Sequence, residues 1–323
     1  MFVKNAKFVK FIKKKISRFS NQLISKIMKQ IIWSVLGLSL LISCKKEPTA
    51  STAEVKEAYD RGTTEMYVES SVYPIVEDIN EVFKTYYNDA DIKLKMLSQN
   101  EILSAVYKDS NRLAIMPKTF SAKELEAFKG RVVPKITPIA KDAVLFITQK
   151  NATDTLINYN DVIAVFKGAK KSEKVFVFHD ANSNIVEKIK TDAGVSELSK
   201  NVYYAKTVEE IVAYINKNKN AVGVVGINWM LQPDAKIKEG IKQLRSMLVY
   251  NDSLKNYYAP SQSTIADNTY PLIRTINIID VQGKTGLGTG FASFAASDKG
   301  QRIVLKSGLM PVTLPKREIN IVE

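Results

Sequence analysis

Residues 175–190 read VFVFHDANSNIVEKIK, and this stretch decides the class of fold. It opens with four apolar β-forming residues, which predict a buried strand. A polar, turn-prone run follows at residues 179–184, and Ile185, Val186 and Ile189 then recur at the spacing of a helix. A strand that turns through small polar residues into a helix is the building unit of an α/β domain.

Such a turn has a chemical consequence. The first N–H groups of a helix have no partner within the helix, and the helix dipole adds partial positive charge at the same end. Together these donors make a seat for an anion or a carbonyl oxygen. The alternative is an ordinary capped helix without a ligand. A functional interpretation therefore depends on finding further turns of this kind.

Two more strand–serine–helix turns precede this one. A strand predicted at residues 63–68 leads through Glu-Ser-Ser at residues 69–71 into a helix with apolar residues at 3–4 spacing. Pro74 lies in the first turn of that helix, where proline is tolerated. A second strand, predicted at residues 91–97, leads through Ser-Gln-Asn at residues 98–100 into another amphipathic helix.

The rest of the chain continues the alternation of strands and helices. Ser121 and Glu124 form the pattern of a capping box, which begins a helix expected to end at Lys129. The apolar run at residues 143–148 predicts a strand that leaves the first domain, and residues 271–281 predict a strand that returns to it. The pattern assigns no element to residues 233–269. Elsewhere it predicts strands at 112–116, 202–205 and 221–226 and helices at 159–166 and 291–296. It also predicts a helix that begins with a capping box, from Thr207 with Glu210, and a glycine-rich turn at 283–290.

The composition bounds the class of protein. A chain of 323 residues with 45% hydrophobic and 25% charged residues has the length and balance of a globular protein with two domains. The formal charge of +14 is concentrated at the N-terminus, because residues 1–43 hold nine Lys or Arg and no acid, which leaves 38 basic and 33 acidic residues. No basic stripe with interleaved aromatic residues follows, so we do not expect nucleic-acid binding.

Metal-binding residue types are scarce. Cys44 is the single cysteine, which excludes an intramolecular disulfide and a cysteine-based metal cluster. His179 is the single histidine, which excludes a histidine-rich metal site. The glycines of residues 283–290 follow the spacing GxGxG and not the dinucleotide fingerprint GxGxxG. We therefore expect no metal and no cofactor.

Residues 28–44, MKQIIWSVLGLSLLISC, have the pattern of a secretory signal. The apolar run at residues 31–43 is shorter than the ~20 residues that a membrane-spanning helix needs. Its end, Leu-Ile-Ser-Cys, resembles the bacterial lipobox, in which the cysteine is lipidated and becomes the first residue of the mature chain. The alternative is a buried apolar helix with a chance cysteine. We expect lipidation at Cys44.

The segments around this signal fit the same interpretation. Residues 1–27 carry eight basic residues and no acid, and we interpret them as translated sequence upstream of a start at Met28 or as a long n-region. Residues 1–43 are thus an upstream extension plus a signal peptide. Residues 44–61 are polar after the cysteine and suit a flexible lipidated tether, so that the folded part begins near Gly62.

In order and spacing, these elements resemble the periplasmic phosphate-binding proteins of ABC importers, the PstS-like solute-binding proteins, over about residues 62–315. The resemblance implies a type II periplasmic binding protein fold, with two α/β lobes, a hinge and an interlobe cleft. Lobe 1 would comprise residues 62–143 and 270–323, and lobe 2 residues 144–269. The similar segments are SSVYP at 70–74, the Ser98 turn, the turn at 182–184, AVGVV at 221–225, YPLIR at 270–274, and the tail from Phe291 through Gly300 and Gln301 to Gly308 and Pro311.

In this family the ligand oxyanion meets helix N-termini and hydroxyl groups from both lobes. Carried over by position, the resemblance implies that both lobes of this chain contribute to one ligand site. The implied ligand-binding residues are Ser70, Ser71, Val72 with its amide, Ser98, Gln99, Lys118, His179, Asn182, Ser183 and Asn184.

The chain also departs from the family pattern. Pro117 stands where phosphate binders carry an aspartate, His179 aligns with their arginine, and Asn-Ile at residues 184–185 replaces Gly-Thr. A histidine, with a reference pKa of about 6.5, does not replace a permanent arginine charge. Lys118 or Arg274 could supply another cation. The expectation that the ligand is phosphate therefore rests on the family resemblance and not on the residues at these positions.

The resemblance implies a monomeric solute-binding lipoprotein that hands phosphate or a related small oxyanion to an ABC transporter permease, on the periplasmic or cell-surface side of a bacterial membrane. The alternative is a PstS-like sensor or surface interaction module that does not bind phosphate. We do not expect an enzyme. Ser71 or Ser183 with His179 and Asp180 supplies the residue types of a hydrolytic triad. However, the histidine and the aspartate are sequence neighbours, and no GxSxG elbow occurs.

Overall fold

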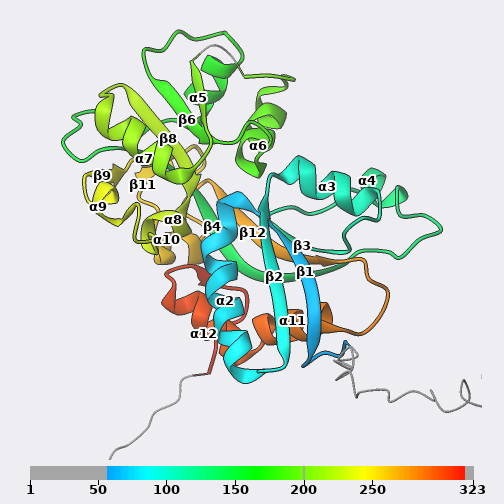
Figure 1. The fold of residues 1–323 in the computed structure, drawn as a ribbon. Helices are drawn as coiled ribbons and strands as arrows, with labels where there is room; N and C mark the ends of the chain where they lie inside the picture. The colour runs from blue at the N-terminus through cyan, green and yellow to red at the C-terminus, as the bar shows by residue number, and fades with distance from the viewer. Residues whose placement is uncertain (1–56, 199–200, 317–323) are drawn as a thin grey trace, which may run out of the picture. The chain divides into compact units, whose positions relative to one another are not determined.

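The computed structural model describes residues 57–198 and 201–316, which belong to one compact unit of the chain, residues 54–323 (Figure 1). The predicted signal and Cys44 lie outside the described residues. Among the residues described, no helix has both the length and the apolar character to cross a bilayer. The packed chain begins before the expected Gly62, since the Glu57 side chain accepts a hydrogen bond from the Leu287 N–H at 3.1 Å.

A ten-stranded mixed sheet runs through the unit in the order β2-β1-β3-β12-β4-β8-β6-β7, with β13 and β9 also paired to β4. β1 is parallel to β2 and β3, and β6 is parallel to β7 and β8, whereas β12 and β4 are antiparallel to their neighbours. This arrangement confirms the predicted α/β class. The strands are β1 (Gly62–Glu69), β2 (Ala90–Leu97), β3 (Leu113–Met116), β4 (Lys135–Gln149), β6 (Val175–His179), β7 (Val202–Ala205), β8 (Ala221–Gly226), β9 (Leu244–Ser246), β12 (Ile273–Asp280) and β13 (Met310–Pro311).

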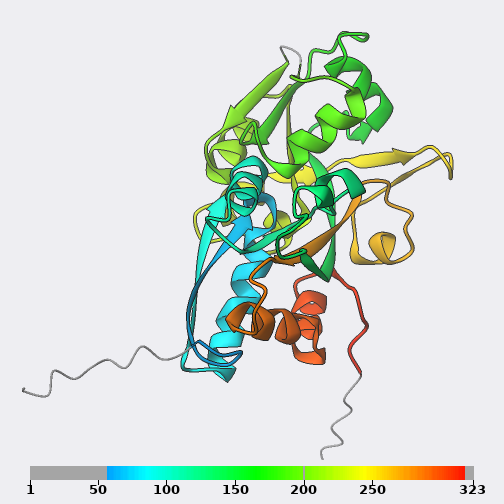
Figure 2. The ribbon, with the colours of Figure 1, turned by 90° about the vertical axis from the view of Figure 1, so that its right-hand side faces the viewer.

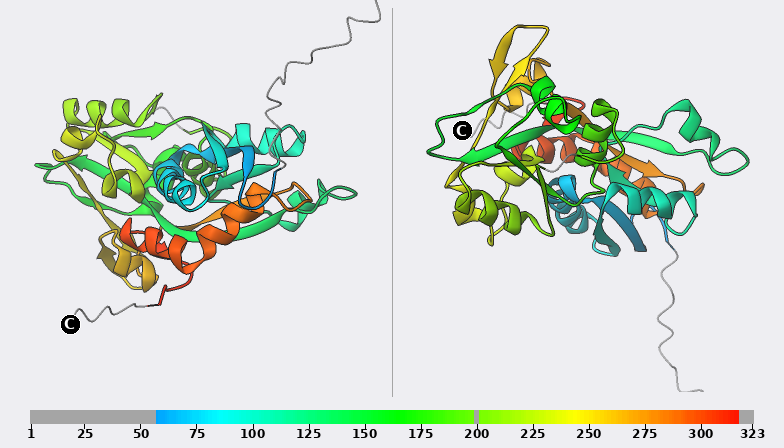
Figure 3. Two further views of the ribbon diagram at one scale, coloured as in Figure 1. Left: turned by 60° about the horizontal axis from the view of Figure 1, so that its bottom comes forward. Right: turned by 90° about the horizontal axis from the view of Figure 1, so that it is seen from above.

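Strand β4 carries the sheet from one half of the unit to the other (Figures 1 and 3). Its residues 135–143 pair with β12, and residues 144–147 pair with β8. The apolar run at 143–148 predicted only part of this strand, because Asp142 interrupts the pattern. Asp142 is nevertheless fully buried, since it lies directly opposite Arg274 on β12. A buried charge is tolerated in a strand when its partner is buried with it.

The strands of the first half separate two apolar cores. On β3, Leu113 and Ile115 face the core shared with Phe83 of α2, whereas Ala114 and Met116 face the core closed by α3. This alternation is the period of two of a strand buried on both faces. The helices are α2 (Tyr73–Tyr86), α3 (Gln99–Tyr107), α4 (Ala122–Glu126), α5 (Tyr159–Phe166), α6 (Asn184–Ala193), α7 (Val208–Lys217), α8 (Ile227–Leu231), α9 (Lys238–Ile241), α10 (Gln262–Ala266), α11 (Leu287–Ala296) and α12 (Asp298–Lys306), with a 3-10 turn η2 (Ser70–Val72) before α2.

The stretch at residues 233–269, to which the sequence pattern assigned nothing, holds short elements. β10 (Leu248–Asn251) and β11 (Asn256–Tyr258) form an antiparallel hairpin, and β10 pairs in parallel with β5 (Leu156–Ile157). Figure 2 shows this hairpin, in yellow, reaching away from the main sheet. Strands of three or four residues are too short to show a period, which explains why the pattern missed them.

Two predicted helix ends were wrong. Helix α4 ends at Glu126 and not at Lys129, because i to i+3 hydrogen bonds replace the helical ones beyond it. Helix α11 begins at Leu287 and not at Phe291. Its Gly290 packs where any Cβ would collide with the Tyr59 carbonyl oxygen, so the glycines serve close packing as well as a turn.

The predicted capping box before α7 is only half formed. The Thr207 side chain accepts from the Glu210 N–H as predicted. The Glu210 carboxylate, however, accepts from the Lys206 N–H at 2.6 Å and not from the cap residue itself. The boxes at Ser98 and Ser121 are complete.

Candidate functional site

The candidate site is built on the turn between β1 and α2. Glu69 ends β1 and caps η2 with extended backbone angles, and its side chain accepts from the Ser71 N–H. Pro74 then occupies the first turn of α2, where its missing N–H costs nothing. Glu69, Ser70 and Ser71 are all buried. The local sequence thus folds a carboxylate back over the start of its own helix.

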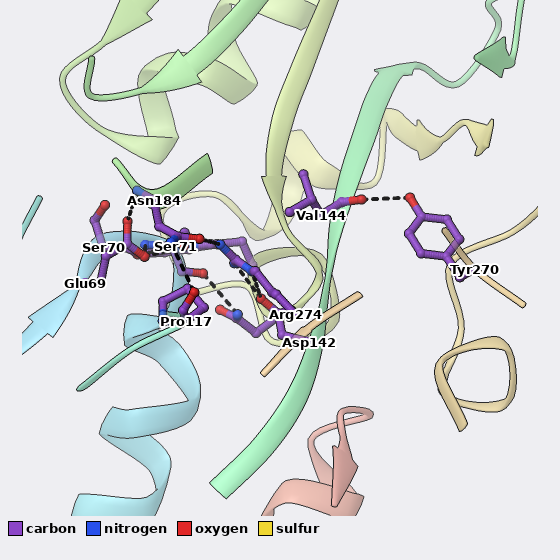
Figure 4. Close-up of polar contacts among 11 residues, drawn as sticks. Glu69, Ser70, Ser71, Pro117, Asp142, Val144, Asn184, Tyr270 and Arg274 are labelled. Carbon is purple, nitrogen blue, oxygen red and sulfur yellow. Dashed lines mark hydrogen bonds and ion pairs between the residues drawn. The ribbon is translucent and has the colours of Figure 1, made fainter. Parts of the chain in front are cut away.

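The Glu69 carboxylate collects donors from two distant parts of the chain (Figure 4). Its Oε2 accepts from the Ser71 N–H at 3.0 Å and from the Ser71 hydroxyl. Its Oε1 accepts from the Asn184 N–H, at the start of α6, at 3.0 Å. The predicted turns at residues 70–71 and 183–184 therefore do converge on one anion, and that anion belongs to the protein itself.

The Asn184 side chain ties three further segments to the same place. Its Nδ2 donates to Gln99 Oε1 at 2.6 Å and to the Pro117 carbonyl at 3.1 Å. Its Oδ1 accepts from Arg274 Nη1 at 3.1 Å. The amide thus uses both of its ends within the protein.

Arg274 and Asp142 form a buried ion pair beside these contacts (Figure 4). Arg274 Nε donates to Asp142 Oδ2 at 2.8 Å, and the side chains are 6% and 0% exposed. Burial raises the pKa of Asp142, and the charge of Arg274 opposes that rise. With Glu69 also fully buried, the site holds two acidic side chains and one arginine.

Helix α8 holds the carbonyl oxygens of the same turn. Asn228 Nδ2 donates to the Ser71 carbonyl at 3.1 Å, and Trp229 Nε1 donates to the Ser70 carbonyl at 3.2 Å. Gly226, just before α8, leaves no room for a side chain, because a Cβ there would lie 2.5 Å from the Ser71 carbonyl oxygen. The turn is therefore held from both the α6 and the α8 side.

A small cavity lies next to the turn. Ser71, His179 and Ser183 line it together with Trp229 and apolar residues of β8. Its volume is about 10 Å³, roughly the space of one water molecule. His179 Nε2 lies 3.0 Å from the Lys206 carbonyl, and its buried Nδ1 has no hydrogen-bond partner among the described residues. This cavity is too small for a tetrahedral oxyanion.

We call the position of the Glu69 carboxylate, with the Ser71 and Asn184 donors around it, the anion seat. Other predicted site residues do not direct their polar groups toward it. Ser98 engages Glu101 with both its N–H and its hydroxyl, in the capping box of α3. Lys118 pairs with Glu124 at 2.7 Å. Asn182 is exposed and contacts Asn100 at 3.4 Å.

Three further predicted residues differ in their surroundings. Ser183 caps α6 by accepting from the Val186 N–H at 3.4 Å, while its side chain also lines the small cavity. Ser70 is buried, and its hydroxyl has no partner among the described residues. Val72 is fully buried in the core against α2.

The serine, histidine and aspartate residues that could supply a hydrolytic triad do not form one. Ser71 donates to a carboxylate, and His179 Nε2 faces a backbone carbonyl. Asp180 has a positive φ of 63° and accepts from the Asn182 N–H in an Asx turn. Within the described residues, no group of three potential metal ligands occurs either.

The sequence analysis missed the residue at the centre of the site. Glu69 directly precedes η2 and caps it, but glutamate is not among the residues that usually cap a helix, so the local pattern gave no signal for this role. Asn228 and Trp229 were not singled out at all, since their partners lie about 160 residues away. Arg274 was named only as a possible cation.

The chain forms a mixed α/β unit in which the η2 turn and the start of α6 share the Glu69 carboxylate. The chain belongs to the family described as the PBP superfamily domain, whose model matches residues 53–299. No curated protein sequence matches the chain. The family match and the similar solved structures confirm the predicted type II periplasmic binding protein fold.

Two solved structures illustrate the likeness. A candidate phosphate ABC transporter substrate-binding protein with bound phosphate, from Clostridium perfringens, has 19% identity and a TM-score of 0.63, over 78% of this chain and 100% of its own. An ABC-type phosphate transport receptor from Vibrio cholerae has 15% identity and a TM-score of 0.58, over 76% and 98%. At these identities the likeness concerns the fold.

Proposed function

We propose that the chain is the solute-binding component of an ABC importer and captures a small oxyanion between the η2 turn and the start of α6. The observation that carries this proposal is the convergence of the Ser71 N–H, the Ser71 hydroxyl and the Asn184 N–H on one carboxylate. Backbone N–H groups at the start of a helix are well placed to hold an anion. The fold supports the importer class, since related structures carry phosphate transport in their names.

Phosphate is the first ligand to test, but the charges count against tight binding. Arg274 is the one cation bonded to the seat among the described residues, and Asp142 already engages it. A charge-assisted hydrogen bond contributes about 1.5–3 kcal/mol, whereas micromolar affinity needs about −8 kcal/mol. An entering solute has to take over the donors that Glu69 now holds. A monoanion therefore suits the seat better than a dianion.

The cellular setting is part of the same proposal. Lipidation at Cys44 would hold the folded unit at a bacterial membrane, on the periplasmic or cell-surface side, where a permease takes the solute. The protein would act as a monomer and without catalysis. Incorporation of labelled palmitate into the wild-type chain and not into Cys44→Ser tests the anchor. Labelling of both chains alike would reject it.

The binding proposal is tested by calorimetric titration of the full chain with phosphate, sulfate and acetate. We expect heat of binding with at least one of them, and an affinity loss of about tenfold in Ser71→Ala, because one charge-assisted donor is removed. Ser121→Ala is the matched control, since Ser121 caps α4 in a capping box outside the seat. Flat titrations across the panel would reject anion capture by the wild-type protein.

A second candidate function has its own observation. The seat is filled by Glu69, and the space beside it holds about one water molecule. These two facts favour a module that stays closed without a solute and acts as a sensor or an interaction surface. Small-angle scattering separates the candidates. A radius of gyration that no anion changes, together with flat titrations, would favour the closed module.

A further inference from the structure

We propose that Glu69 acts as a tethered ligand, that is, an anion that belongs to the chain and occupies the anion seat. Its carboxylate holds the η2 turn and α6 together and excludes free anions from the seat until it is displaced. This inference deepens the proposed function and rests on it for the identity of the seat. In this inference one side chain controls both the contact between the η2 turn and α6 and the affinity of the seat for free anions.

The bonding of Glu69 matches that of a bound anion. The side chain is 0% exposed, and both of its oxygens accept hydrogen bonds. None of the ion pairs among the described residues includes it. A buried carboxylate is stable only when hydrogen bonds replace its hydration. The donors that satisfy Glu69 belong to two separate segments, so its burial requires those segments to stay together.

The polar groups around the seat are bonded to other partners, so Glu69 is the anion that the seat holds. Arg274 is committed to Asp142 and to the Asn184 side chain. Asn184 therefore offers its backbone N–H, and not its side chain, to the seat. The carbonyl groups of the η2 turn are held by α8. Removal of the Glu69 carboxylate would free the Ser71 and Asn184 donors without removing any other contact of the turn.

Tethering gives Glu69 an advantage over any free anion. A group attached to the chain competes at an effective concentration of about millimolar or higher and loses no translational freedom on binding. A free anion of equal intrinsic affinity therefore binds weakly while Glu69 is present. Loss of the Glu69 charge should raise the affinity of the seat for small anions by about tenfold or more.

The missing group can be supplied from solution. Glu69→Ala removes a CH2 and a carboxylate, which together have the size of acetate. We expect this variant to melt at a lower temperature than wild type. Its Trp229 emission should shift to the red, because the Trp229 side chain is buried against the Ser70 carbonyl. Millimolar acetate should reverse both changes and leave wild type unaltered.

The readout uses one tryptophan. The chain contains Trp33 and Trp229, so a Trp33→Phe background isolates the reporter next to the turn. Glu101→Ala is the matched control. Glu101 also accepts from a serine N–H and hydroxyl, but within a single capping box at the surface. Its loss should lower the melting temperature, and acetate should not restore it.

If Glu69→Ala does not fold, Glu69→Gln decides the question. Glutamine keeps the shape, loses the charge and turns an amide NH2 toward one of the donors. We expect tighter binding of acetate or sulfate to Glu69→Gln than to wild type. Equal affinities, or a folded Glu69→Ala that acetate does not rescue, would overturn the tethered-ligand proposal.

The outcomes also separate this inference from the proposed function. Wild type that binds phosphate tightly, with both Glu69 variants unchanged, would overturn the inference and leave anion capture standing. Flat wild-type titrations with acetate rescue of Glu69→Ala would support the inference and reject capture by the natural protein.

Discussion

The backbone N–H of Asn184 donates to the carboxylate of Glu69 at 3.0 Å, although 115 residues separate the two in sequence. One residue ends the first strand of the sheet, and the other begins the helix after β6. Their contact joins the η2 turn, which follows β1, to the start of α6.

The Asn184 side chain should be important for stability. We expect Asn184→Ala to lower the free energy of unfolding by about 2–3 kcal/mol, because Arg274 Nη1, Gln99 and the Pro117 carbonyl all lose a buried partner. Urea denaturation measures the change. Asn182→Ala is the control, since that exposed side chain lies two residues away and should cost no more than about 0.5 kcal/mol. Equal losses in both variants would contradict the network.

The Asp142–Arg274 pair should show strong coupling. Arg274→Met alone is expected to cost about 3–5 kcal/mol, because it leaves the Asp142 carboxylate buried without its counter-charge. Asp142→Leu combined with Arg274→Met should recover most of that loss. A double-mutant cycle in urea gives the coupling, and additive losses would argue against it. The exposed pair Lys242–Glu239 is the control, and Lys242→Ala should change stability by less than about 0.5 kcal/mol.

Gly226 should control the contact between β8 and the η2 turn. A Cβ at Gly226 would lie 2.5 Å from the Ser71 carbonyl oxygen and 2.8 Å from Arg274 Nη2. We expect Gly226→Ala to lose about 1–3 kcal/mol and to shift Trp229 emission to the red as the turn moves away.

A second glycine on the same strand provides the matched control for Gly226. A Cβ at Gly223 would meet Ile215 and Ile147 in the core, not the turn. Gly223→Ala should therefore lose stability by a similar amount without a shift in the emission of Trp229. A red shift in both variants would mean that the emission reports general loosening.

The capping box of α3 should make a pH-dependent contribution. Hydrogen bonds from the Ser98 N–H and hydroxyl lower the pKa of Glu101 below its usual value. A carboxyl group with a lowered folded pKa stabilises the protein above its unfolded pKa of about 4.3 and loses that effect as the pH falls through the folded value. Glu101→Gln should thus be less stable than wild type at pH 7, by about 0.5 kcal/mol.

Thermal melts between pH 3 and pH 8 test this expectation, and the two curves should meet at the acid end. Glu126→Gln is the control, since Glu126 is the last residue of α4 and lies outside the capping box of that helix. A constant difference between Glu101→Gln and wild type across the range would mean that the charge of Glu101 is not the cause.

Local pattern was sufficient for most elements. The strand at residues 175–178 and the helix after Ser183 follow from hydrophobic spacing and a cap, and α5, β7 and β8 begin and end where the pattern predicted. Elsewhere, contacts between residues distant in sequence made the local pattern an incomplete guide. Strand β4 is longer than predicted because the buried Asp142 pairs with Arg274 on another strand. The glycine-rich start of α11 is helical, and its Gly290 packs against the Tyr59 carbonyl group.

The sequence alone determined the parts of this protein that depend on neighbours within a few residues: the alternating strands and helices, the serine caps at Ser98, Ser121 and Ser183, and the family likeness. Only the tertiary structure decided which of those turns meet and what lies between them. The Ser98 donors are used within their own helix, whereas Ser71 and Asn184 share Glu69. Convergence depends on the order of strands in the sheet, and residue spacing along a chain carries no record of that order.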